Sequence, residues 1–199
     1  TAGMKWGEVQ QLRDEPEEPF GTLSPEEAPQ MFCRINPAVV HLPEDPKTPL
    51  MMVGLGTGLA PFRSFIQQRI EQKNDGQEVG EVALYFGARY KETEFMYREE
   101  MEAWEADGTI DYLKLAFSRD QEEKVYAQHK IDEDPELVYD FMMNKGGSFY
   151  LCGPAGNMPA QMKEAVVNAI AKVGEMPQEE ALELVTQWQI TGRYNVEVW

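Results

Sequence analysis

The chain has 199 residues, 42% of them hydrophobic, and a formal net charge of −17 at pH 7. This length and composition fit a folded domain with a sizeable core and exclude an intrinsically disordered chain. The acidity disfavours nonspecific binding to nucleic acid or to acidic membrane surfaces, and no apolar run approaches membrane-spanning length.

The cysteines and histidines are few. The two cysteines, Cys33 and Cys152, lie far apart and lack the spacing of a disulfide framework or a zinc site. With only two histidines in the chain, we expect no metal site. Two free thiols suit a reducing intracellular compartment, for which the cytoplasm is the expected one.

Along the chain, residues 1–49 are rich in proline and acid, which is typical of an extended segment and a connection. From residue 50 onward, apolar runs alternate with helical patterns, and we treat residues 50–199 as one domain. This alternation predicts an α/β fold, a three-layer sandwich in which helices flank a parallel sheet. The predicted strands are 50–53, 82–86, 112–117, 148–152 and 193–199, and the predicted helices are 62–72, 95–106, 136–144, 158–173 and 177–189.

A glycine-rich turn separates the first strand from the first helix. Gly54, Gly56 and Gly58 alternate there, and Thr57 lies between the last two. A turn of this kind can direct backbone N–H groups and a positive helix end at a phosphate. The alternative is a tight strand-to-helix connection that binds nothing, since the spacing differs from the ordinary dinucleotide fingerprint.

A second polar stretch follows the strand 112–117. Within it, Ser118, Arg119, Lys124 and Tyr126 offer a hydroxyl, a guanidinium, an ammonium and a phenol, which together would fit the 2′-phosphate of NADP(H). The alternative is a solvated loop in which the two cations pair with neighbouring acids. Because ligands of parallel sheets bind beyond the carboxyl ends of the strands, we expect this stretch to share one crevice with the glycine turn and Cys152.

Cys152 and the C-terminal strand can each be interpreted in more than one way. Cys152 ends an apolar strand, so it is either a small buried hydrophobe or a thiol beside a reacting ligand. Trp199 follows a strand pattern, and its indole could lie against another aromatic system. Glu197 would point to the same side of that strand as Trp199.

Four motifs in order resemble the NADP-binding domain of the diflavin reductases, a family with the ferredoxin–NADP reductase fold. They are Gly-Leu-Gly-Thr-Gly-Leu-Ala-Pro-Phe-Arg (54–63), Phe-Ser-Arg-Asp-Gln-x-x-Lys-Val-Tyr-x-Gln-His (117–129), Tyr-Leu-Cys-Gly-Pro (150–154) and Arg-Tyr-x-x-x-x-Trp (193–199). The resemblance covers nearly all of the chain from about residue 31. Residues 1–49 would then be the tail of an FAD-binding domain and a connector.

The resemblance also implies roles for matching residues. Gly56, Thr57 and Gly58 would line the path of the pyrophosphate and nicotinamide. The adenosine 2′-phosphate and ribose would be held by Ser118, Arg119, Lys124, Tyr126 and Gln128. The catalytic residues would be Cys152 beside the nicotinamide C4, Glu197 where the family usually has Asp, and Trp199 over the FAD ring.

The implied function is that of an NADPH-dependent diflavin oxidoreductase, of which this chain is one domain. NADPH would exchange a hydride with FAD, and FMN would carry electrons onward to an acceptor protein or domain. The implied partners are the FAD and FMN domains of the same polypeptide and that downstream acceptor. No membrane contact is indicated. The alternatives are a non-catalytic NADP(H)-binding sensor and an acidic docking module.

Overall fold

The computed structural model describes residues 40–199. Five strands form one sheet in the order β3-β2-β1-β4-β5, and every neighbouring pair is parallel. Their bounds are Leu50–Leu55 (β1), Val82–Ala88 (β2), Tyr112–Phe117 (β3), Ser148–Gly153 (β4) and Tyr194–Val198 (β5). All five carboxyl ends therefore lie at one edge of the sheet.

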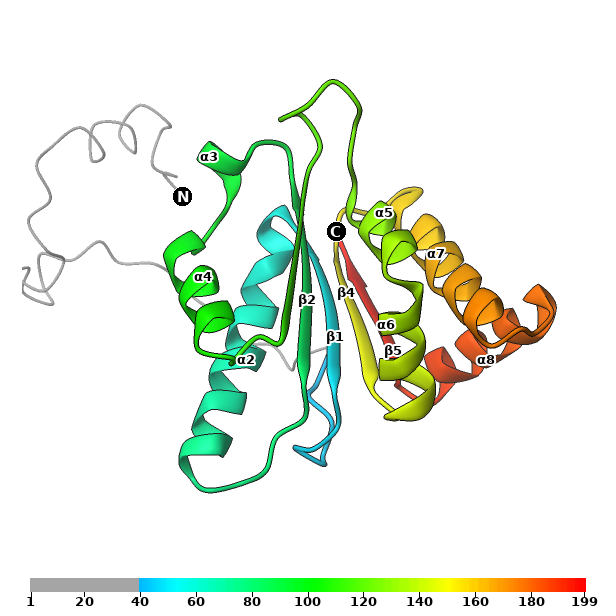
Figure 1. The fold of residues 1–199 in the computed structure, drawn as a ribbon, viewed down its shortest axis with the longest axis horizontal. Coiled ribbons are helices and arrows are strands. Elements are labelled where there is room, and N and C mark those ends of the chain that lie inside the picture. The colour runs from blue at the N-terminus through cyan, green and yellow to red at the C-terminus, as the bar shows by residue number, and fades with distance from the viewer. Residues whose placement is uncertain (1–39) are drawn as a thin grey trace, which may run out of the picture. The chain divides into compact units, whose positions relative to one another are not determined.

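Helices cover both faces of this sheet (Figure 1). One face packs against α2 and α4, and the other against α5, α6, η3, α7 and α8. The bounds are Gly56–Gly58 (η2, a 3₁₀ turn), Leu59–Asn74 (α2), Lys91–Glu94 (α3), Arg98–Ala106 (α4), Ala127–Glu133 (α5), Pro135–Tyr139 (α6), Asp140–Asn144 (η3, a π-helical turn), Met158–Val173 (α7) and Gln178–Ile190 (α8). The predicted three-layer α/β sandwich is confirmed.

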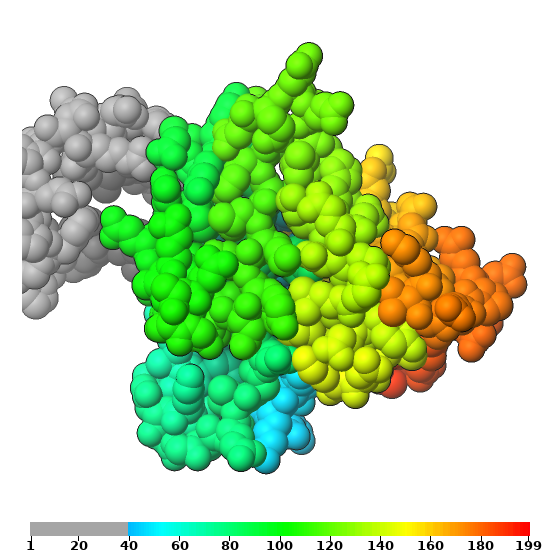
Figure 2. Space-filling view, in the orientation of Figure 1, coloured from blue at the N-terminus to red at the C-terminus, as the bar shows by residue number. Residues whose placement is uncertain are grey.

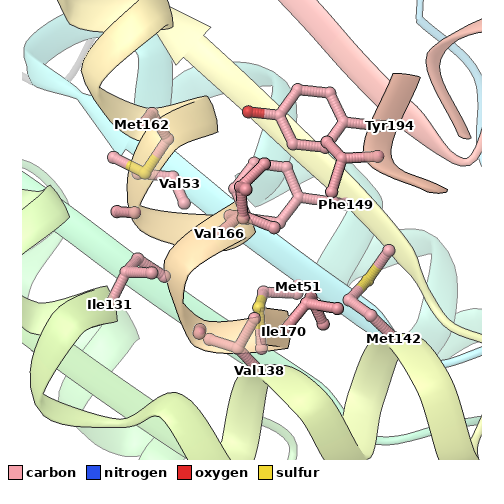
Figure 3. Close-up of a cluster of buried hydrophobic side chains, with 14 of the residues drawn as sticks. Met51, Val53, Ile131, Val138, Met142, Phe149, Met162, Val166, Ile170 and Tyr194 are labelled. Atoms are coloured by element: carbon pink, nitrogen blue, oxygen red, sulfur yellow. The ribbon is translucent and has the colours of Figure 1, made fainter. Parts of the chain in front are cut away.

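The central strand β1 shows how the two cores are built. Met51 and Val53 pack into the cluster beneath α5 to α8, shown in Figure 3, whereas Leu50 and Met52 pack into the cluster beneath α2 and α4. All four side chains are fully buried. A strand buried on both faces reads as a continuous apolar run, which explains why this stretch shows no alternation. Full burial of such a side chain contributes about 1.5–3 kcal/mol to the free energy of folding, relative to leaving it exposed.

The predicted helix 95–106 is wrong at its start. The structure has the short α3 before it, and α4 begins only at Arg98, because Tyr97 adopts a left-handed conformation with φ of 53°. A helix cannot run through a residue in that conformation. The sequence patterns also missed α5, which begins at Ala127, within the predicted phosphate-binding stretch that ends at Gln128.

The predictions for residues 1–39 lie outside the residues that the structure describes. Within residues 40–199, no helix combines the length and apolar character needed to cross a membrane. The same part of the chain contains no cluster of three or more His, Cys, Asp or Glu side chains that could hold a metal ion.

Candidate functional site

The glycine turn lies against the end of β4. A Cβ atom at Gly58 would come within 2.1 Å of the Cys152 carbonyl oxygen, so only glycine lets η2 approach the neighbouring strand this closely. Gly56 has a φ of +53°, which again favours glycine. Thr57 is exposed between them. Two of the predicted motifs, the glycine turn and Cys152–Pro154, are therefore in direct contact, as the sequence led us to expect.

Trp199 reaches back to this contact. Its backbone N–H donates to the Gly153 carbonyl at 3.3 Å, and the Ala155 N–H donates to the Trp199 carbonyl at 2.8 Å. The Trp199 Cη2 atom lies 3.2 Å from the position that a Cβ at Gly58 would occupy. With 58% of its surface exposed, the indole offers a flat apolar face beside the glycine turn.

Cys152 and Glu197 are partners in the register between β4 and β5. Cys152 is only 4% exposed and packs in the apolar cluster beneath α2 and α4. Burial, and then the nearby Glu197 carboxylate, raise the pKa of the Cys152 thiol to about 11. The thiol is therefore neutral at physiological pH. Its predicted place at the nicotinamide end of the crevice stays a prediction.

A pocket of about 510 Å³ opens on the other face of the sheet, at the same edge. Its floor comes from the ends of β1, β2 and β3, and its walls from the starts of α5 and α7. The lining residues are Leu55, Gly87, Ala88, Ala116, Val125, Tyr126, Ala127, Gln128, His129, Pro154, Asn157, Met158 and Gln161. Tyr126 and Gln128 are thus brought together with Pro154, whereas Cys152 is not part of the lining and packs on the opposite face of the sheet. Ser118, Arg119 and Lys124 are not part of the lining.

Side-chain contacts organise the wall formed by α5. The Tyr126 backbone N–H donates to His129 Nδ1 at 3.3 Å, and the two rings meet edge to face with centroids 5.5 Å apart. Gln128 Nε2 donates to Gln161 Oε1 at 3.4 Å, which links α5 to α7. The wall therefore combines an exposed phenol ring with amide groups, a combination suited to a flat polar heterocycle and a ribose.

The loop between β3 and α5 projects from this edge of the sheet (Figure 1, Figure 2). Ser118 is largely buried at its base, and its N–H donates to the Ala88 carbonyl at 2.9 Å. Arg119 and Lys124 are exposed, and neither forms an ion pair with any residue in 40–199. The alternative in which these cations pair with Asp120, Glu122 and Glu123 is not what the structure shows.

Sequence reasoning missed three features of this site. His129 lies one turn into α5 beside Tyr126, and only an explicit prediction of that helix would have placed it there. Asn157 and Met158 line the pocket from the start of α7. Arg89 follows β2 directly, at the same edge of the sheet, and forms an ion pair with Glu94. Its position after a strand end was the available signal.

Another hollow, of about 420 Å³, lies between α7 and α8 and is almost wholly apolar. Its lining includes Lys163, Val167, Gln178 and Leu182. None of the residues singled out in the sequence contributes to it.

Sequence comparison identifies relatives of this chain. The chain is similar to NADPH–cytochrome P450 reductase of Drosophila melanogaster, at 42% identity over 159 residues, or 80% of this chain and 23% of that protein. It is similar to the protein of the same name from Mus musculus, at 38% identity over 182 residues, or 92% of this chain and 26% of that protein. The chain therefore spans about a quarter of the length of these relatives.

A family model described as "Oxidoreductase NAD-binding domain" matches residues 52–164, which is more than half of the chain. That match runs from β1 into α7 and includes the glycine turn, the loop after β3 and the end of β4. The resemblance drawn from the sequence motifs is thereby confirmed. The chain belongs to the oxidoreductase NAD-binding domain family.

Proposed function

We propose that residues 50–199 form the NADP(H)-binding domain of an NADPH-dependent diflavin oxidoreductase, and that residues 1–49 are the tail of its FAD-binding domain and a connector. The observation that carries this proposal is a pair of exposed cations in the loop after β3, Arg119 and Lys124, which form no ion pair with residues 40–199 in a chain with a net charge of −17. Two such cations, on the loop that leads into the pocket at Val125 and Tyr126, suit a nucleotide that bears an extra phosphate.

In this proposal, residues at the carboxyl edge of the sheet are assigned to each part of the ligand. Tyr126 and Gln128 would hold the adenosine, with Ser118, Arg119 and Lys124 around its 2′-phosphate. Gly56, Thr57 and Gly58 would border the pyrophosphate. Gly56 has no neighbour within 4 Å of its missing Cβ and Thr57 is exposed, whereas Gly58 is buried and lets the turn pack against β4. The nicotinamide would then lie toward Cys152, Glu197 and Trp199. This assignment extends from the pocket face of the sheet across η2 to the face covered by α2.

The bound coenzyme supplies the hydride that is exchanged with FAD in this proposal. The domain's own residues bind and orient it. Because its pKa is raised, Cys152 stays a neutral thiol that packs against the ring and does not act as a nucleophile. Glu197, in register with Cys152, places a carboxylate beside the reacting end. Trp199 would cover the FAD ring and would give way to the nicotinamide.

In the proposed full-length protein, FAD and FMN belong to other domains of the same polypeptide, and FMN passes electrons to a downstream acceptor. The compartment is a reducing intracellular one, with the cytoplasm as the proposed location. An indole held beside the glycine turn supports this function over a non-catalytic sensor, since a sensor has no flavin to cover.

Calorimetry with 2′,5′-ADP and 5′-AMP tests the proposal. Wild-type protein should bind 2′,5′-ADP more tightly than 5′-AMP. Arg119→Ala should lower the affinity for 2′,5′-ADP by about ten- to a hundredfold, because a hydrogen bond to a charged group contributes about 1.5–3 kcal/mol. The affinity for 5′-AMP should change little. Equal affinity of the wild type for both ligands would contradict the proposal.

A further inference from the structure

Asp120 stands next to Arg119 in the loop after β3, yet its carboxylate is directed elsewhere. Asp120 Oδ2 accepts a hydrogen bond of 3.0 Å from the backbone N–H of Lys91, the first residue of α3. Arg119 instead lies over the ring of Tyr90, with its guanidinium carbon 6.0 Å from the ring centroid. The acid and the cation are neighbours in sequence and are not paired.

This bond adds to a backbone framework at the base of the loop. The Ser118 and Arg119 N–H groups donate to the Ala88 and Arg89 carbonyls, each at 2.9 Å. Gln121 Nε2 donates to the Phe117 carbonyl at 2.6 Å. Two backbone bonds thus join the loop to the end of β2 and to Arg89, and the Asp120 side chain, further along the loop, joins it to the start of α3.

The hydrogen-bond partner of Asp120 determines whether its carboxylate neutralises the neighbouring Arg119 guanidinium. An exposed carboxylate beside an arginine can form an ion pair with it, but such pairs are weak. A backbone N–H at a helix start that lacks an intrahelical acceptor gives a carboxylate a stronger bond. Once the carboxylate is held by Lys91 N–H, the guanidinium remains available to an incoming anion.

We infer that Asp120 is a positioning residue for phosphate recognition: its bond to the Lys91 N–H fixes the outer part of the loop and keeps Arg119 unpaired for the 2′-phosphate. This inference rests on the proposed function, because the anion is the 2′-phosphate assigned there. Asp120 acts through Arg119 and does not itself touch the ligand.

Two variants of Asp120 separate the hydrogen bond from the charge. Asp120→Asn removes the negative charge but keeps an oxygen that can accept from Lys91 N–H, whereas Asp120→Ala removes both. Because neither variant carries the charge, the ratio of their 2′,5′-ADP affinities reports the hydrogen bond alone. We expect Asp120→Ala to bind about three- to tenfold more weakly than Asp120→Asn, and both to bind 5′-AMP equally.

A second pair of variants removes the donor and leaves Asp120 intact. Lys91→Pro abolishes the N–H at the first position of a helix, where proline is tolerated. Tyr90 already has the extended backbone (φ −132°, ψ 134°) that a residue before proline requires. Lys91→Ala, which keeps the N–H, is the matched control for loss of the lysine charge. We expect Lys91→Pro to bind 2′,5′-ADP about three- to tenfold more weakly than Lys91→Ala, with 5′-AMP unaffected.

The double variant Asp120→Ala with Lys91→Pro completes the test. Because Asp120→Ala already removes the hydrogen bond, Lys91→Pro and Lys91→Ala should bind 2′,5′-ADP equally when each is combined with Asp120→Ala. The inference would be overturned if Asp120→Asn and Asp120→Ala bound 2′,5′-ADP equally, or if Lys91→Pro and Lys91→Ala did. The proposed function would still stand in that case if wild type preferred 2′,5′-ADP over 5′-AMP and Arg119→Ala lost that preference. If wild type shows no such preference, the proposed function itself fails.

Discussion

The two ends of the candidate site are built in opposite ways. At one end, the loop after β3 projects from the sheet and presents Arg119 and Lys124 without ion pairs among residues 40–199. At the other end, Cys152 is buried and Glu197 adds negative charge beside it. An exposed cationic loop is suited to attract and select a ligand, whereas close packing is suited to hold a reacting group in one geometry. We therefore expect affinity and chemistry to depend on different residues.

The largest expected effect is a loss of stability on disruption of the close packing between the glycine turn and the end of β4. In Gly58→Ala, the new Cβ would meet the Cys152 carbonyl oxygen at 2.1 Å, and backbone atoms cannot move aside cheaply. We expect a loss of about 3 kcal/mol in the free energy of unfolding, measured by chemical denaturation. Gly76→Ala is the control, since Gly76 has a φ of +83° and no neighbour within 4 Å. It should lose only about 1–2 kcal/mol from backbone strain. Equal losses in the two variants would show that close packing at Gly58 is not required.

The next effect concerns the reactivity of Cys152. Its pKa of about 11, against an ordinary value of 9.0, should make alkylation by iodoacetamide at pH 8 about a hundredfold slower than for an unperturbed thiol. The measurement uses the Cys33→Ser variant, so that Cys152 is the only thiol that can be alkylated. Glu197→Gln should speed the reaction, because the carboxylate contributes to the raised pKa. Rapid labelling at pH 8 that Glu197→Gln does not change would contradict this description of the packed end.

The same shift fixes the sign of a pH effect on stability. The folded state favours the neutral thiol, so this contribution is fully present below pH 9.0 and is lost as the pH rises through about 11. Denaturation of wild type and Cys152→Ser at pH 8 and pH 10.5 should show a larger decrease for wild type.

The smallest expected effect is a change in coenzyme preference on deletion of Trp199. This residue combines features of both ends of the site, because its backbone is hydrogen-bonded while its ring is exposed. Deletion of Trp199 in the intact flavoprotein should remove the cost of displacing the indole and shift the ratio of kcat/KM toward NADH by several-fold to about tenfold. An aromatic contact contributes about 0.5–1.5 kcal/mol beyond area burial. An unchanged ratio with unchanged NADP⁺ affinity would mean that Trp199 is only a surface residue.

The comparison also shows what the sequence could predict. The strand Tyr112–Phe117 and the helix Met158–Val173 have the predicted bounds, because both are long, regular patterns between clear breaks. The start of α4 was wrong, since the left-handed backbone at Tyr97 has no signal in a residue that normally avoids it. Local patterns therefore located most elements, but they missed α3 and α5 and the start of α4.

Within the site, residue types and strand ends located the glycine turn and the loop after β3, because parallel strands bring their carboxyl ends together. They could not show that Asp120 binds Lys91 N–H rather than Arg119, since that depends on α3, which is far away in sequence. Nor could they decide the burial of Cys152, which results from packing between β1, β4 and α2. Contacts between distant elements decided these points.

Stopped-flow reduction of FAD at increasing NADPH concentration tests the central claim, the division between a binding end and a chemical end, most directly. In the proposed full-length flavoprotein, Arg119→Ala should raise the NADPH concentration for half-maximal rate by about ten- to a hundredfold and leave the limiting rate nearly unchanged. Cys152→Ala should lower the limiting rate and leave that concentration nearly unchanged. A lowered limiting rate in Arg119→Ala, or wild-type rates in Cys152→Ala, would contradict the division.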